Sequence, residues 1–181
     1  IEASGAFDEV LRTRIGSPHV LAGMEKLQQT HERVAGFEAN GGFLLGSSLE
    51  EGGKILRALP TRDAGLPAVT LLVAAARRGV PLSRLLNELP ARYTASDRLQ
   101  DFPVATSRRL INQWQAEPFE VVRMLGLDSP LTSVDTTDGL RVTLDNGDIV
   151  HLRPSGNAPE LRCYCESKDH PASQALVHKV L

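Results

Sequence analysis

A turn rich in hydrogen-bond donors connects two alternating segments near the C-terminus, in HLRPSGNAPELRCYCES at residues 151–167. A phosphate dianion needs a positive charge, several converging donors and a backbone that it can approach closely. Arg153 offers a bidentate fork and Ser155 a hydroxyl, and Gly156 and Asn157 can present backbone N–H groups. The turn therefore predicts anion binding, and the alternative is a hairpin turn with an incidental arginine.

A second polar loop, GFEANGG at residues 36–42, has the residue types that recognise vicinal hydroxyls. The Glu38 carboxylate can accept two hydrogen bonds, and the Asn40 amide both donates and accepts. Gly41 and its small neighbours leave room for a ligand beside them. Composition alone favours the other interpretation, an ordinary turn with a solvated glutamate.

A third candidate is TRIGSPH, residues 13–19, at the predicted start of a helix. The unpaired N–H groups of a helix start can bind an anion or a polar ligand, which makes Gly16 and Ser17 candidate contacts. The simpler interpretation is a plain N-cap, with Ser17 as the capping residue and Pro18 at the first helical position.

Alternation, helical periodicity and turn residues predict the elements that position these loops. In the first half we expect a strand over residues 9–16, a helix after Ser17, a hairpin with its bend at residues 40–42, a helix over 64–78 and a short helix after Pro81. In the second half we expect a strand over 91–102, a helix over 104–118, strands joined by turns at 138–139 and 146–147, a strand over 160–167 and a helix over 171–181. The pattern predicts an α/β fold: a partial three-layer α/β/α domain, then a small α+β domain with an antiparallel sheet, with a boundary near residues 90–95.

Composition excludes several classes of function. A formal net charge of −2 over 181 residues gives no broad basic surface, so nucleic-acid binding is not expected. There is no apolar run long enough to cross a bilayer, no secretory signal, no P-loop, no Rossmann fingerprint and no nucleophile elbow. Cys163 and Cys165 should project from the same face of one strand, a poor geometry for a disulfide, so we expect reduced thiols and a cytoplasmic protein.

The candidate motifs together resemble the α-D-phosphohexomutases. RPSGNAPELRCYCES is similar to their phosphate-binding loop, R-P-S-G-T-E-P followed by R-x-Y-x-E, and departs from it at Asn157 and Ala158. GFEANGG is similar to their sugar-recognition loop, G-E-x-S-G-G or G-E-x-S-G-H, and departs from it at Phe37 and Asn40. RTRIGSPHVLAGM is similar to the strand, turn and helix that precede that loop, so the resemblance covers nearly the whole chain.

The resemblance implies the last two domains of a four-domain phosphomannomutase or phosphoglucomutase. Residues 1–92 would be an N-terminally incomplete third domain, which recognises the sugar, and residues 93–181 the fourth domain, which binds phosphate. Such enzymes interconvert hexose 1-phosphate and hexose 6-phosphate through a hexose bisphosphate intermediate. Their phosphoserine and their Mg²⁺ ligands belong to the first two domains, so we expect no catalytic and no metal-binding residue in this chain, and no turnover by the chain alone.

The resemblance also assigns roles by position. Contacts to the sugar would come from Glu38, Asn40, Gly41, Gly16 and Ser17, and the phosphate that is not transferred would be held by Arg153, Ser155, Gly156 and Asn157. The expected partners are a phosphosugar that lies between Glu38 and Arg153 and the missing N-terminal domains, with no nucleic acid and no membrane. The Glu-x-Asn variant of the sugar loop favours mannose phosphates over glucosamine phosphates. The alternative to an enzyme is a non-catalytic module that binds a phosphosugar or another anion for regulation.

Overall fold

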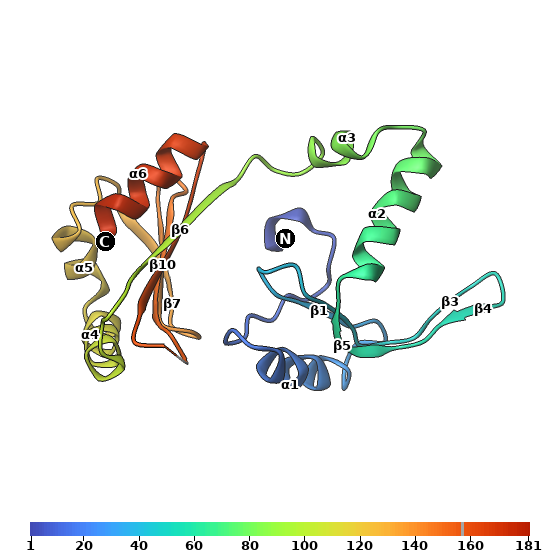
Figure 1. The fold of residues 1–181 in the computed structure, drawn as a ribbon, viewed down its shortest axis with the longest axis horizontal. Coiled ribbons are helices and arrows are strands. Elements are labelled where there is room, and N and C mark those ends of the chain that lie inside the picture. The colour runs from blue at the N-terminus through green and yellow to red at the C-terminus, as the bar shows by residue number, and fades with distance from the viewer. Residues whose placement is uncertain (157) are drawn as a thin grey trace. The chain divides into compact units, whose positions relative to one another are not determined.

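The computed structural model describes residues 1–156 and 158–181, apart from the side chains of residues 3 and 86 (Figure 1). These residues form two compact units, Ile1–Leu89 and Pro90–Leu181. No helix among the described residues has the length and apolar character that crossing a bilayer requires.

The first unit has a small antiparallel sheet in the order β1-β2-β5 and a separate two-stranded hairpin, β3-β4. Figure 1 shows that hairpin extending away from the sheet. The elements are η1 (Glu2–Ser4), α1 (Ser17–Leu27), β1 (Ala35–Phe37), β2 (Phe43–Leu45), β3 (Leu49–Glu51), β4 (Lys54–Leu56), β5 (Leu59–Asp63), α2 (Gly65–Arg78) and α3 (Leu82–Leu86).

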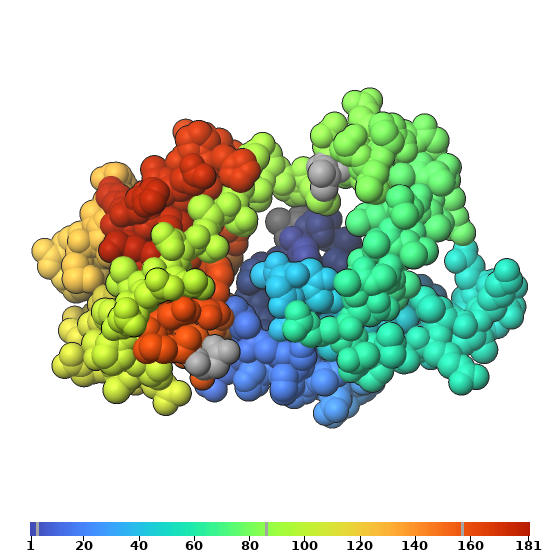
Figure 2. All heavy atoms as spheres, viewed as in Figure 1, coloured from blue at the N-terminus to red at the C-terminus, as the bar shows by residue number. Residues whose placement is uncertain are grey.

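The core of the first unit lies between α1 and its sheet. It is small, with Val20, Met24, Val34 and Leu44 as its buried cluster. Helix α2 lies at the surface of the unit, in green in Figure 2. Its Val69 and Leu72 side chains are 58% exposed each, so most of the apolar surface of α2 has no partner within the described residues.

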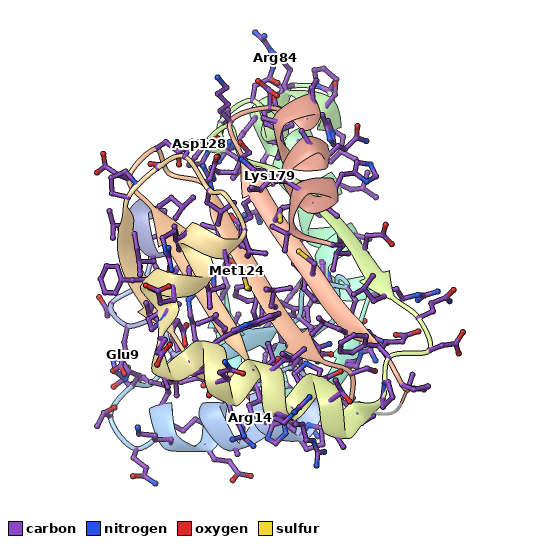
Figure 3. The ribbon with its side chains drawn as sticks, turned by 90° about the vertical axis from the view of Figure 1, so that its left-hand side faces the viewer. Glu9, Arg14, Arg84, Met124, Asp128 and Lys179 are labelled. Atoms are coloured by element: carbon purple, nitrogen blue, oxygen red, sulfur yellow. The ribbon has the colours of Figure 1, made fainter. Side chains whose placement is uncertain are left out.

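The second unit is a five-stranded antiparallel sheet, in the order β6-β10-β9-β8-β7, with helices over one face. The elements are β6 (Tyr93–Leu99), α4 (Val104–Ala116), α5 (Pro118–Met124), β7 (Leu131–Asp135), β8 (Leu140–Leu144), β9 (Ile149–Pro154), β10 (Leu161–Ser167) and α6 (His170–Val180). Figure 3 shows α4, α5 and α6 in front of the sheet.

Strand alternation explains why one face of the second sheet is covered and the other is polar. Burial alternates along β8 and β10, and the inward side chains pack in one cluster against the helices. Cys163 and Cys165 belong to that cluster, are fully buried and carry free thiols 3.6 Å apart, which confirms that they project from the same face. The opposite face carries the charged and polar side chains of the site described below.

Most of the elements predicted from the sequence are confirmed, including the bend at residues 40–42, the helix that ends at Arg78 and the alternating strands of the second unit. The strand expected over residues 9–16 is wrong. That segment pairs with no strand within the described residues; Leu11 and Thr13 lie instead against Gly23 of α1. The hairpin β3-β4 and helix α5 were not predicted.

The sequence suggested Ser17 as the N-cap of α1, and this prediction is wrong. The cap residue is Gly16, whose φ of 125° lies where L side chains are rarely found, and Ser17 is the first helical residue with Pro18 after it. The serine hydroxyl is therefore available for a contact outside the helix.

Candidate functional site

The bend between β1 and β2 forms a tight loop around Glu38. The Glu38 N–H donates to the Gly42 carbonyl at 2.8 Å, and the Gly41 N–H donates back to the Glu38 carbonyl at 3.0 Å. Asn40 uses its Oδ1 to accept from the Gly42 N–H at 3.0 Å, an Asx turn. Its amide N–H groups remain as donors for a ligand, whereas the amide oxygen is already used.

The Glu38 carboxylate is held in place by neighbouring side chains. Composition alone suggested a solvated glutamate, and the structure shows a buried one. Its side chain is 8% exposed. The Ser17 hydroxyl donates to Oε2 at 3.2 Å, and Arg62 Nε of β5 lies 3.3 Å from the same oxygen. Within the described residues both contacts fall on Oε2, so Oε1 keeps its capacity to accept hydrogen bonds from hydroxyl groups.

The contact between Ser17 and Glu38 joins two segments that the sequence analysis treated as separate candidates. It places the start of α1, with Gly16 as its cap, against the loop that contains Asn40 and Gly41. The predicted sugar-contact residues therefore lie together in the first unit. Sequence reasoning missed Arg62, because only the pairing of β2 with β5 brings it to the loop.

The predicted phosphate loop connects β9 to β10 in the second unit. It is closed by a hydrogen bond from the Ser155 N–H to the Glu160 carbonyl at 2.9 Å, and Ser155 is fully buried. Gly156 is exposed, and a Cβ added there would meet nothing within 4 Å, so a ligand could approach this backbone closely. Asn157, the remaining predicted contact, lies outside the described residues.

Arg153 precedes the loop and is almost entirely buried, at 7% exposure. Its Nη2 donates to the Tyr164 hydroxyl at 3.4 Å, and its guanidinium carbon lies 5.7 Å from the centre of the Tyr164 ring. Its Nε lies 3.7 Å from Asp138 Oδ2, in an ion pair without a hydrogen bond. That Nε is buried and has no hydrogen-bond partner among the described residues, and such groups are rare enough to call for an explanation.

His151 fixes the turn that carries Asp138. Its Nε2 lies 2.5 Å from the Asp138 carbonyl oxygen, so in the neutral ring this nitrogen donates. Burial lowers the His151 pKa below its usual value, against the smaller opposing effect of the Asp138 contact, and this favours the neutral ring at pH 7. The Tyr164 ring lies 5.8 Å away and completes the packing beside Arg153.

Three arginines lie in a row across this end of the polar face. Arg98 on β6, Arg162 on β10 and Arg153 on β9 are direct cross-strand partners, so their side chains project to the same face. Glu160 Oε2 accepts from Arg162 Nε at 3.0 Å and forms an ion pair with Arg162 Nη2 at 3.0 Å, and Glu160 Oε1 lies 3.4 Å from Arg98 Nε. The hydrogen bond that Arg162 donates to Glu160 raises the Arg162 pKa above its usual value.

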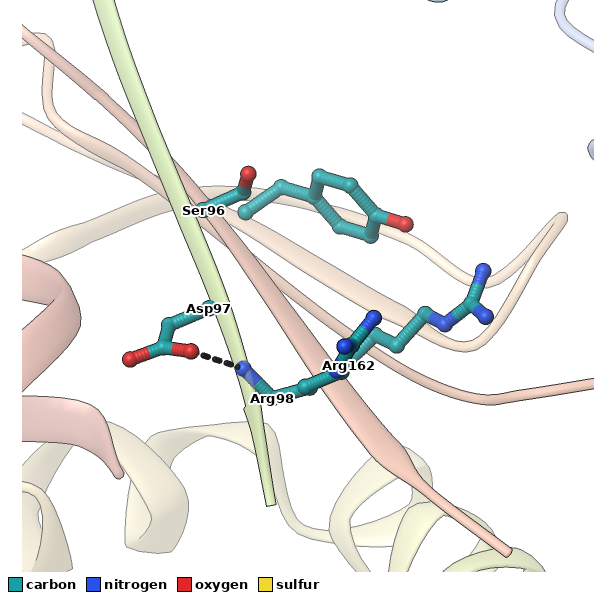
Figure 4. A pocket seen from close by; sticks show the side chains of 5 residues that line it. Ser96, Asp97, Arg98 and Arg162 are labelled. Atoms are coloured by element: carbon teal, nitrogen blue, oxygen red, sulfur yellow. Dashed lines mark hydrogen bonds between the residues drawn. The ribbon is translucent and has the colours of Figure 1, made fainter. Parts of the chain in front are cut away.

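Arg98, Arg162 and Tyr164, together with Ser96 and Asp97, line an open depression of about 360 Å³ on this face (Figure 4). The volume is at the lower end of the range found for ligand sites, roughly 300–1,000 Å³. Sequence reasoning singled out Arg153 but not its two neighbours in the row. Strand alternation in YTASDRL and LRCYCES, with the antiparallel pairing of the two segments, is the signal that could have found them.

Among the described residues, no three His, Cys, Asp or Glu side chains gather closely enough to hold a metal ion. Glu38 belongs to the first unit and Arg153 to the second, and the expectation that both face one ligand stays a prediction.

Comparison with known proteins defines the class. Residues 3–93 match the family model described as phosphoglucomutase/phosphomannomutase, alpha/beta/alpha domain III, and residues 87–181 match that of the C-terminal domain. The chain belongs to the phosphoglucomutase/phosphomannomutase family, as the resemblance of its motifs predicted, and the predicted fold class is confirmed.

Among curated relatives, a phosphomannomutase of Salmonella muenchen is 47% identical over the whole chain, and one of Sinorhizobium fredii (strain NBRC 101917 / NGR234) is 43% identical over 98% of it. The chain spans 38% and 37% of these two relatives. A probable phosphoglucosamine mutase of Methanopyrus kandleri is 29% identical over 93% of the chain, and the chain spans 32% of its length.

The crystal structure of a phosphoglucomutase/phosphomannomutase family protein from Burkholderia thailandensis has the same fold. It superposes on 93% of the chain with a TM-score of 0.64 at 21% sequence identity, and the chain covers 31% of it.

Proposed function

We propose that this chain is the sugar- and phosphate-binding part of a phosphohexomutase that interconverts hexose 1-phosphate and hexose 6-phosphate. The curated relatives, named phosphomannomutase and phosphoglucosamine mutase, support an enzyme of this type over a non-catalytic regulatory module. The observation that carries the proposal is Arg153, a buried arginine with an unsatisfied Nε, beside a loop whose Gly156 is open to a ligand.

In this proposal the first unit recognises the sugar. Oε1 of Glu38 accepts hydrogen bonds from ring hydroxyls, while Ser17 holds Oε2 and so fixes the orientation of the carboxylate. Asn40 donates through its amide nitrogen, because its oxygen is engaged with Gly42. Gly16 and Gly41 leave space for the ring beside these polar groups.

The second unit binds the phosphate that is not being transferred. Arg153 neutralises its charge, Ser155 and Gly156 shape the loop around it, and Asn157 is a further donor by resemblance. A site that holds either phosphate of a reorienting hexose bisphosphate needs donors without bulky neighbours, and Gly156 meets that need. The division into a third domain, residues 1–92, and a fourth, residues 93–181, is part of this proposal.

Covalent chemistry lies outside the proposed role of this chain. Phosphoryl transfer in such an enzyme uses a phosphoserine and Mg²⁺, and the described residues hold no group of side chains suited to the metal. We therefore expect the 181 residues alone to bind a phosphosugar without converting it. Mannose phosphate is the expected substrate, since the two relatives above 40% identity are named phosphomannomutases. The cytoplasmic location stays a prediction.

The proposal is tested by calorimetric titration of the chain with mannose 1-phosphate. Replacing Arg153 by Ala should weaken binding by about 1.5–3 kcal/mol, roughly 10- to 150-fold, because charge-assisted hydrogen bonds are lost. The control is Arg123→Ala, which removes an exposed arginine of α5 that pairs with Glu120 and should leave affinity unchanged. Equal affinity of the folded Arg153→Ala variant and the wild-type chain would contradict the assignment.

A further inference from the structure

The row of three arginines is neutralised from within the chain. Arg153 faces Asp138, and Arg98 and Arg162 both contact Glu160. Three guanidinium groups thus face two carboxylates, which leaves the row with one positive charge in excess. A site of this kind attracts an anion even when its internal ion pairs are formed.

The Glu160 carboxylate oxygens lie against Arg162 and Arg98, where the oxygens of a bound anion would lie. The Glu160 side chain is 12% exposed, and its Oε2 lies 3.0 Å from both Nε and Nη2 of Arg162, the guanidinium edge that arginine also turns towards phosphate. Its backbone closes the loop through Ser155. The carboxylate that occupies the two arginines therefore belongs to the same loop that is proposed to bind phosphate.

Arg98 is the outer member of the row. It lies on β6, an edge strand, and its side chain is 51% exposed at the rim of the depression that Arg162 and Tyr164 also line (Figure 4). Its contact with Glu160 Oε1, 3.4 Å long, is looser than the two contacts of Arg162. A long, half-exposed side chain on a loose ion pair can turn to a ligand at little cost.

We propose that Arg98 is a further anion-binding residue of this site, and that the Glu160 carboxylate occupies Arg98 and Arg162 until the phosphate group of a sugar ester displaces it. The proposal rests on the phosphate-binding function proposed above. It adds an arginine that the loop motif does not contain, and it makes phosphate binding an exchange of one anion for another.

The exchange is tested with Glu160→Gln, which removes the charge and keeps the shape of the side chain. Titration with mannose 1-phosphate should show roughly tenfold tighter binding, because a negative charge close to the phosphate has been removed. The matched control is Glu166→Gln. Glu166 lies on β10, also contacts two arginines, Arg92 at 3.7 Å and Arg141 at 3.9 Å, and has no part in the loop. Its replacement should leave affinity unchanged.

The role of Arg98 is tested with Arg98→Ala, which should weaken binding roughly tenfold. Its control is Arg92→Ala, which removes an arginine that pairs with Glu166 and should leave the affinity for mannose 1-phosphate unchanged. Combining Arg98→Ala with Glu160→Gln should restore nearly wild-type affinity, since one charge of each sign is removed. The log of the affinity should also fall less steeply with log salt concentration in Arg98→Ala than in the wild-type chain.

The outcomes separate this proposal from the one on which it rests. If Arg153→Ala abolishes binding while Arg98→Ala has no effect, the role of Arg98 is refuted and the phosphate site stands. Weaker binding by Glu160→Gln would show that Glu160 orients the arginines and is not displaced, which overturns the exchange. If the wild-type chain fails to bind mannose 1-phosphate at all, the phosphate-binding function itself fails.

Discussion

Gly139 lies against the backbone of Arg153 in the second unit, and the position of Arg153 depends on the absence of a Cβ atom there. It has a φ of +86°, and a Cβ at this position would clash with the Leu152 carbonyl oxygen and with Arg153 itself. Its own carbonyl accepts a hydrogen bond from Gln115 of α4 at 2.8 Å. Glycine is needed here both for its backbone conformation and for the close approach of β9.

Replacing Gly139 by Ala should therefore lower the free energy of unfolding of the second unit by roughly 2–4 kcal/mol, since backbone strain and a steric clash add. The measurement is urea unfolding followed by the fluorescence of Trp114, the one tryptophan of the chain, which packs against the core of this unit.

Gly147→Ala separates the two causes of that loss. Gly147 has a similar φ of +83°, but its Cβ would meet only the flexible end of Arg92 at 3.6 Å. Gly147→Ala should therefore lower the free energy of unfolding only by the backbone strain, about 1–2 kcal/mol. Equal losses in the two variants would show that the clash beneath Arg153 is relieved by a backbone shift.

At this scale the sequence predicted the loop residues but not their partners. Glu38 and Asn40, or Arg153 and Ser155, stand close together in the chain, so residue type and spacing were sufficient to select them as candidates. Arg62 and Arg98 reach these loops only because their strands pair with β2 and β10, which are not adjacent to them in the chain. A search for local motifs does not contain that information.

Among the elements, those with a complete local signal could be predicted and those that depend on a partner could not. β8 and β10 alternate and are bounded by turn residues, so their strands follow from the sequence. Residues 9–16 alternate as well, yet no strand in the described part of the chain pairs with them. Helix α5, Pro118–Met124, was missed because seven residues are too few to show a helical period.

Helix α6 allows two acidic contacts to be compared on one element. Asp169 is its N-cap and accepts from the Ala172 N–H at 2.7 Å, whereas Asp128 pairs with Lys179 in its last turn at 3.0 Å (Figure 3). Asp169→Ala should lower the free energy of unfolding by about 1 kcal/mol, because a backbone donor loses its acceptor. Trp114 fluorescence in urea is again the measurement.

Asp128→Ala is the matched control. The Asp128 side chain is 95% exposed, so its ion pair is screened by water and its removal should change stability very little. A larger loss for Asp128→Ala than for Asp169→Ala would show that the surface ion pair, and not the cap, anchors the helix.

For the molecule as a whole, the two units differ greatly in the size of their cores. The buried cluster of the first unit contains four residues and that of the second thirteen. Burial of apolar side chains is the main source of stability. The first unit should therefore be the less stable of the two.

We expect urea to unfold the first unit at a lower concentration than the second. Far-UV circular dichroism, which reports on both units, should show a loss of signal before the Trp114 fluorescence changes. Superimposable transitions by the two probes would mean that the units unfold as one, and the small core of the first would then not set its stability.

The buried thiols of Cys163 and Cys165 have a practical consequence. Their mutual contact and their burial raise the pKa of the Cys165 thiol, so the reactive thiolate does not form at neutral pH while the fold is intact. Maleimide dyes should consequently modify cysteines introduced at the surface, for example in place of Lys54 and Lys168, which are both exposed, without removal of the native pair. The chain is thus already suited to energy-transfer measurements in the presence and absence of a phosphosugar.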